Sequence, residues 1–131
     1  MIYLGIDYGA RRLGIAVSDE EGKLAFPLSV ISNSANLLNE VAEICQNRKI
    51  EAIVLGDSKD FSMQENEIMR EIKPFAKKLG NKTGLPVYLH QEFLTSIEAE
   101  RIQGKNEMHD ASSAAIILRS YLDTNNESKI K

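Results

Sequence analysis

Three carboxylates in this chain lie where predicted secondary-structure elements begin or end. Asp7 closes an apolar run near the start of the chain, Glu92 follows the run 86–91, and Asp110 precedes a helical pattern. Open α/β sheets usually hold their ligands at such ends. Carboxylate oxygens suit Mg²⁺ or Mn²⁺, so three of them meeting at one place would form a metal site. The spacing along the sequence does not by itself bring them together.

Each of these acids also has a plain structural role. Asp7 is of a residue type that commonly starts turns, and Glu92 could be an ordinary surface glutamate. Asp110 could be an N-cap, which stabilises a helix by about 1 kcal/mol. Its spacing of four residues from Ala114 favours another role, because the carboxylate would then lean toward the sheet. A carboxylate that points inward needs a partner.

Other common catalytic signatures are missing from the sequence. It has no Gly-x-x-x-x-Gly-Lys-Ser/Thr phosphate loop and no Gly-x-Gly-x-x-Gly dinucleotide fingerprint. One cysteine, Cys45, and two histidines, His90 and His109, are too few for a closed structural zinc site. We expect Cys45 to pack in the core and the histidines to be ordinary polar residues.

Length and composition fit one globular domain. The chain has 131 residues, 43% of them apolar and 27% charged, and single domains usually hold roughly 100–150 residues. We expect the domain at 1–123 and a polar, flexible tail at 124–131. No apolar run approaches the roughly 20 residues that cross a bilayer, and the first residues lack the features of a signal peptide. With one cysteine and hence no internal disulfide, we expect a cytoplasmic protein.

The net charge is −3, from 16 basic and 19 acidic side chains. The chain therefore lacks the overall basic character of many nucleic-acid-binding proteins. A metal-dependent nuclease stays compatible with this charge, because metal ions bring positive charge to the site. The lysines at 77, 78 and 82 are expected to form only a solvated helix face.

Hydrophobic patterning predicts an α/β fold. Strands are expected at 2–7, 13–19 and 23–31, and together they read as an antiparallel meander. The wholly apolar run at 52–56 is typical of a strand buried on both faces in a parallel sheet. With a fifth strand at 86–91, the result is a five-stranded mixed sheet with helices on both faces.

Four helices are expected between and after these strands. Pro74 should kink the second of them. The first helix should start just past Ser34. The second should begin at the capping pair Ser62 and Glu65 and end at Gly80 and Gly84. The third should run from Thr95 to Gly104, and the fourth should carry an apolar stripe from Ala111 to Leu122.

Several segments, taken in order, carry a resemblance to a known family. They are Gly5–Asp19, Phe26–Leu28, Val54–Gly56, Glu92–Ser96, Asp110 with Ala114–Leu118, and Tyr121–Leu122. Together they resemble the YqgF family, the RNase-H-like Holliday junction resolvases that are also described as pre-16S ribosomal RNA nucleases. A strand followed by Asp-x-Gly also resembles the phosphate loop of sugar kinases and actin-like ATPases, but those enzymes close two such domains around a nucleotide.

The resemblance implies an RNase-H-like fold and a metal-dependent nuclease that hydrolyses phosphodiesters in structured nucleic acid. The substrate would be a ribosomal RNA precursor, cut during maturation of the 16S 5′ end, or branched DNA. Asp7, Glu92 and Asp110 are implied as the catalytic acids and as the ligands of Mg²⁺ or Mn²⁺, with two ions expected. The candidates for contact with phosphates are Arg11, Arg12 and Arg101; for the first two a solvated turn is an equal alternative.

Two departures from the family pattern leave an alternative open. Phe93 stands where the family typically has arginine, and Asp57-Ser58 stands where Leu-Pro is usual. Asp57 could be a further metal ligand, although a turn is favoured. The loss of the arginine weakens the expected grip on phosphate, so a non-catalytic module that binds RNA or a protein partner is the competing hypothesis. Divalent-ion binding separates the two.

Overall fold

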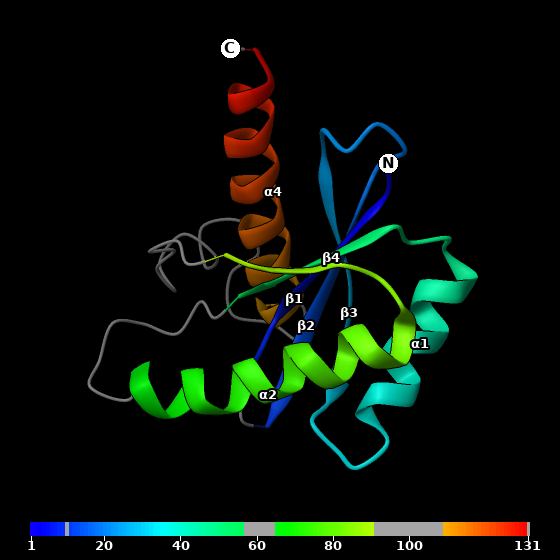
Figure 1. Cartoon of the computed structure of the whole chain (residues 1–131), viewed down its shortest axis with the longest axis vertical. Coiled ribbons are helices and arrows are strands. Elements are labelled where there is room, and N and C mark those ends of the chain that lie inside the picture. Colours follow the sequence, from blue (N-terminus) through cyan, green and yellow to red (C-terminus); the bar gives the residue numbers. More distant parts are fainter. Residues whose placement is uncertain (10, 57–64, 91–108, 131) are drawn as a thin grey trace.

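A five-stranded mixed sheet forms the centre of the molecule, with strand order β3-β2-β1-β4-β5 (Figure 1). The computed structural model describes residues 1–9, 11–56, 65–90 and 109–130, and it describes side chains in these ranges outside 65–71, 109–112 and 124–130. The elements are β1 (Tyr3–Asp7), β2 (Arg12–Ser18), β3 (Ala25–Ser32), α1 (Leu37–Asn47), β4 (Ala52–Gly56), α2 (Glu65–Thr83), β5 (Val87–Leu89) and α4 (His109–Ile130).

Strand directions confirm the predicted meander and the predicted parallel strands. β1 and β3 both run antiparallel to β2, whereas β4 is parallel to β1 and β5 is parallel to β4. The first four strands begin and end within two residues of their predicted limits. Because β1, β4 and β5 are parallel, their carboxyl ends share one edge of the sheet, where Asp7 is the register partner of Gly56.

Helices cover both faces of the sheet. α1 and α2 lie on one face, where Leu4 and Ile6 join the larger core, and α4 lies on the other, where Tyr3 joins the smaller core (Figure 1). Side chains alternate between the faces of a strand, so Gly5 and Asp7 face α4 together with Tyr3. All five residues of β1 are buried, because helices pack on both of its faces.

β3 forms one edge of the sheet, and its pairing with β2 is irregular. The register shifts between Ile15 and Ala16, whose partners are Ser29 and Pro27. Leu28 is therefore the extra residue of a β-bulge. Pro27 has no N–H, which suits an edge position.

The carboxyl end of α1 is closed by a Schellman motif. The Ile50 N–H donates to the Cys45 carbonyl over 2.9 Å, and Lys49 has a φ of 56° at the position that usually holds glycine. Cys45 is free and buried, as predicted, and burial raises the pKa of its thiol to about 11.

Helix α2 ends at Gly84, the second of the two glycines predicted to stop it. Gly80 lies inside the helix, so its prediction as a stop is wrong, while Gly84 follows the last helical residue with a φ of 73°. The Gly84 N–H donates to the Gly80 carbonyl over 2.8 Å. Burial of Leu79 offsets the small cost of a glycine inside the helix at position 80. The chain leaves the helix only at Gly84, whose φ is left-handed. The capping residue Ser62 lies outside the described residues.

α4 is longer than its apolar stripe. It continues to Ile130, whereas the sequence predicts a polar tail from Thr124, and no glycine or proline interrupts 123–130. The limits of the domain itself stay a prediction. None of the helices that the structure describes has the length and apolar character of a membrane span. The helix predicted from Thr95 to Gly104 lies outside the described residues.

Candidate functional site

Asp7 lies at the carboxyl end of the central strand and is nearly buried, with 6% of its surface exposed. Its neighbours in the sheet are Gly14 on β2 and Gly56 on β4. The Tyr8 N–H donates to the Gly56 carbonyl over 2.8 Å, which extends the pairing with β4 one residue past Asp7. A carboxylate this deeply buried is uncommon, since Asp is among the residues least often buried. The structure holds it on a rigid strand.

Helix α4 runs antiparallel to β1 on the face that carries Asp7. The rings of Tyr3 and Tyr121 have centroids 5.9 Å apart, and a Cβ built on Gly5 would lie 3.1 Å from the Ala114 carbonyl oxygen. Two residues further along β1 advance the strand by about 6.7 Å to Asp7, and four residues back along α4 move about 6 Å toward its start. The first turn of α4 therefore approaches the sheet edge that carries Asp7.

Asp110 belongs to that first turn. It lies four residues before Ala114, on the same line along the helix. Its backbone position fits the predicted convergence with Asp7. The Asp110 side chain lies outside the described part of the structure, so the meeting of the two carboxylates stays a prediction.

Close packing joins the ends of β4 and β5 to α4. A Cβ at Gly56 would lie 2.7 Å from the His90 carbonyl oxygen and 3.0 Å from the Ile117 Cγ2. Only glycine fits there without displacement. The His90 N–H donates to the Leu55 carbonyl over 3.0 Å and continues the parallel pairing past β5. These contacts fix the point from which the chain leads to Glu92, two residues further on.

His90 connects the end of β5 to α4. Its Nε2 lies 3.1 Å from the Ser120 Oγ, and its ring stands edge-on to Tyr121 at 5.6 Å. The side chain is half-buried. This agrees with the predicted structural role, and it directs the imidazole along α4, away from the start of that helix.

The turn between β1 and β2 presents two arginines at the same edge as Asp7. Arg11 and Arg12 are both exposed, and Arg12 is the first residue of β2. Asn33 holds the turn: its N–H donates to the Arg11 carbonyl over 2.9 Å and its Nδ2 donates to the Gly9 carbonyl over 2.8 Å. Sequence reasoning missed Asn33, because nothing local marks a contact between segments so far apart.

The described structure thus brings some predicted site residues to one edge. Asp7, Arg11 and Arg12 lie there, and the first turn of α4, which contains the backbone of Asp110, approaches it. Glu92, Asp57, Phe93 and Arg101 lie outside the described residues. Among the side chains that are described, no three acidic, histidine or cysteine groups come close enough to hold a metal ion. The buried carboxylate of Asp7, at a strand end, is nevertheless the kind of oxygen donor that a hard divalent cation prefers.

Sequence comparison matches most of the chain to one family. The family profile described as "RuvX: Holliday junction resolvase" matches residues 1–124. Three similar proteins carry the name "Putative pre-16S rRNA nuclease". The one from Nitratidesulfovibrio vulgaris is 34% identical, over 94% of this chain and 84% of that protein. The one from Protochlamydia amoebophila is 35% identical over 92% of each, and the one from Lawsonia intracellularis is 33% identical over 100% and 99%.

Solved structures show a similar fold at lower identity. Thermus thermophilus RuvC in complex with a Holliday junction substrate has a TM-score of 0.64 at 20% identity, covering 95% of this chain and 96% of that one. The fowlpox virus resolvase in complex with Holliday junction DNA has a TM-score of 0.56 at 14% identity, covering 95% and 99%. These resolvases have an RNase-H-like fold, which confirms the predicted fold class.

Proposed function

The chain belongs to the RuvX family of Holliday junction resolvases and is a nuclease, and we propose that it hydrolyses phosphodiester bonds at the sheet edge that carries Asp7. The substrate we favour is a ribosomal RNA precursor, cut during maturation of the 16S 5′ end. The relatives named for that activity are about a third identical over nearly the whole chain. Branched DNA is the second candidate, because a structural neighbour binds a Holliday junction.

One observation carries the proposal. Helix α4 packs antiparallel on β1. Its first turn, which contains Asp110, therefore approaches the sheet edge at which β1 ends with Asp7. Two acids 103 positions apart in the sequence thereby approach one place. The chain after His90 starts from the same edge, so Glu92 is within reach as the third acid.

Asp7, Glu92 and Asp110 are the residues that would hold the divalent cations, Mg²⁺ or Mn²⁺, and we expect two of them. When bound, such cations lower the pKa of an attacking water and stabilise the leaving oxygen. Asp7 contributes a carboxylate held by a strand buried on both faces. Arg11 and Arg12 are exposed beside it, and we assign them to the backbone phosphates of the substrate. Arg101 is assigned the same role from the sequence alone.

We place this activity in the cytoplasm, where precursor ribosomal RNA would be met. The single cysteine is buried and free, which fits a reducing compartment.

A cleavage assay tests the proposed function. The wild type is incubated with Mg²⁺ or Mn²⁺ and either a structured RNA carrying the 16S 5′ junction or a four-way DNA junction. Asp7→Asn should abolish cleavage of the true substrate. Asp123→Asn is the matched control, because Asp123 is an exposed acid on α4 whose contact is an ion pair with Arg119. It should cut at the wild-type rate.

Cleavage by Asp7→Asn at the wild-type rate would refute the assignment of the site. If the wild type binds either nucleic acid but cuts neither with either metal, the non-catalytic binding module becomes the better description.

A further inference from the structure

The exposed surface of α2 carries four positive charges and, from Lys73 to the end of the helix, no negative one. Lys73, Lys77, Lys78 and Lys82 are all exposed, and we call them the α2 lysine face. No acidic residue occurs between Glu71 and Glu92 in the sequence. Within the described part of the chain, no ion pair joins these lysines to a carboxylate. Their charge is therefore not neutralised locally, although the whole chain is net negative.

The lysines form two rows along the helix. Lys73 and Lys77 are four residues apart, as are Lys78 and Lys82, so each pair lies on one line. Residues 72, 75 and 79 face the core between α2 and the sheet, which leaves the two rows on the flanks of the outer surface. From the first lysine to the last, the helix advances about 14 Å.

Further basic residues extend the α2 lysine face toward α1. A groove of about 690 Å³ separates α1 from the end of α2, and Lys49 and Lys82 both line it, with Glu43 as its one acidic lining residue. Arg48 is exposed beside Lys49. Lys49 occupies a left-handed position that favours glycine. The chain keeps a positive charge there against the preference of the backbone.

We propose that the α2 lysine face, together with Arg48 and Lys49, binds the phosphate backbone of a double-helical arm of the substrate. This inference rests on the proposed nuclease function and adds a binding surface to it. Duplex nucleic acid carries a phosphate on each strand about every 3.4 Å along its axis, so 14 Å of helix spans about four base pairs. Unneutralised lysines facing such a backbone release counterions on binding, which supplies affinity without reading sequence.

The position of this surface suits an arm outside the reacting junction. α2 lies on the face of the sheet opposite α4 (Figure 1), and its carboxyl end leads into the start of β5, at the edge opposite Asp7. The length of a five-residue strand such as β4, about 15 Å, separates the two edges. A duplex arm held here would leave the catalytic edge free for the strand to be cut. It would also supply the grip that Phe93, in place of the family arginine, does not give.

The test measures binding without cleavage. Full-length Asp7→Asn protein is titrated in EDTA with labelled 20-base-pair RNA and DNA duplexes by fluorescence anisotropy, at several KCl concentrations. Removing two phosphate contacts with Lys78→Gln/Lys82→Gln should reduce the slope of log affinity against log salt by about 1.8. The ratio of parent to variant affinity for the duplex should then fall about tenfold as KCl rises from 50 to 200 mM.

The control variant is Lys23→Gln/Arg119→Gln, which removes the same charge. Both residues are exposed, and each pairs with an acid, Lys23 with Glu21 at 3.4 Å and Arg119 with Asp123 at 3.9 Å. It should keep the parent salt slope, and Lys78→Arg/Lys82→Arg should keep both slope and affinity. Equal behaviour of the glutamine and control variants would overturn the proposal, as would the absence of duplex binding at 50 mM KCl.

Cleavage does not enter this measurement. A protein that binds duplex through the α2 lysine face but cuts nothing would refute the nuclease proposal and leave the binding surface standing.

Discussion

Gly5 of β1 lies so close to Leu118 of α4 that a Cβ at residue 5 would be 2.8 Å from the Leu118 Cβ. The Ala114 carbonyl oxygen, 3.1 Å from the same point, belongs to the backbone and cannot rotate away. The helix therefore rests on the strand at a distance that only glycine permits. That distance sets how near the first turn of α4 comes to the strand end at Asp7.

Gly5→Ala should lower the free energy of unfolding by about 1–3 kcal/mol, because α4 must move away from β1. Urea denaturation followed by circular dichroism measures it. The matched control is Gly80→Ala, whose Cβ would meet only the Leu85 carbonyl oxygen at 3.7 Å and the Val87 Cγ2 at 3.8 Å. It should raise the stability by about 0.5–1 kcal/mol, since alanine is the better helix former. Equal stability of Gly5→Ala and wild type would mean that α4 packs less closely than described.

Asp110→Asn should leave the metal-free protein as stable as the wild type or more stable, because acids gathered at one edge repel each other. The same change should abolish Mg²⁺-dependent cleavage. Mg²⁺ at ten times its dissociation constant should stabilise the wild type by about 1.4 kcal/mol, and the variant much less. Thermal melts with EDTA and with Mg²⁺ give both readings. A lower melting temperature of Asp110→Asn in EDTA would instead show that the Asp110 charge serves only to stabilise the first turn of α4.

Lys49→Gly should separate stability from binding. Glycine relieves the left-handed conformation at φ 56°, so the free energy of unfolding should rise by about 0.5–1 kcal/mol. The same variant should bind duplex more weakly at low salt, because it removes one charge from the basic surface. Chemical denaturation and anisotropy on one protein preparation measure both. Lys49→Gln is the control, because it removes the same charge without relieving the left-handed conformation. A gain in stability of Lys49→Gly without any loss of binding would remove Lys49 from that surface.

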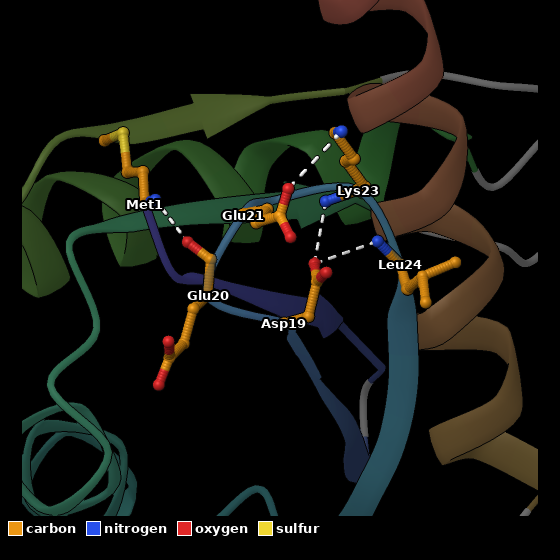
Figure 2. Close-up of polar contacts among 6 residues, drawn as sticks. All are labelled: Met1, Asp19, Glu20, Glu21, Lys23 and Leu24. Atoms are coloured by element: carbon orange, nitrogen blue, oxygen red, sulfur yellow. Dashed lines mark hydrogen bonds and ion pairs between the residues drawn. The ribbon is translucent and has the colours of Figure 1, made fainter.

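Asp19 should make part of the stability depend on acid pH. Figure 2 shows its carboxylate closing the β2–β3 turn: Oδ1 accepts the N–H groups of Lys23 at 2.7 Å and Leu24 at 3.0 Å. These two hydrogen bonds, first that from Leu24, hold the pKa of Asp19 below its ordinary value. The stabilisation is therefore complete above the unfolded pKa of about 3.9 and is lost as the pH falls through the lower folded value.

Melting temperatures of wild type and Asp19→Asn between pH 7 and pH 2.5 check this. The wild type should be the more stable protein at pH 7, and the difference should close below about pH 4. A difference that stays constant over the whole range would show that the charge of Asp19 is not involved. The neighbouring Met1 ammonium donates to the Glu20 carbonyl (Figure 2), so we expect the substitution to leave this hydrogen bond in place.

The elements buried on both faces could be predicted from sequence, and the ends of the helices could not. The run Ala52–Gly56 is wholly apolar because helices cover both its faces, so pattern and structure agree to the residue. In α4 the apolar stripe ends at Leu122, and the sequence pattern alone does not show that the helix continues to Ile130. Gly80 and Gly84 look alike in the sequence, but only Gly84 has the positive φ that a helix end requires.

The site was predictable as a set of residue types, and its assembly depends on tertiary packing. Asp7 could be placed at a strand end, and its burial follows from the position of β1 at the centre of the sheet. The approach of Asp110 depends on how α4 is set against Gly5, which no local pattern encodes. Asn33 holds the turn that contains Arg11 through a hydrogen bond to Gly9, 24 residues earlier in the chain. The place of Glu92 stays a prediction.

The irregular outer strand has a consequence for how this protein behaves when crowded. An eight-residue strand at a sheet edge is a template onto which another chain can add, and such addition begins aggregation. Pro27 withholds a hydrogen-bond donor in the middle of that strand, and the bulge at Leu28 breaks the regular spacing of the others. Self-association through β3 is thereby discouraged, although Leu24 and Phe26 are exposed near this edge.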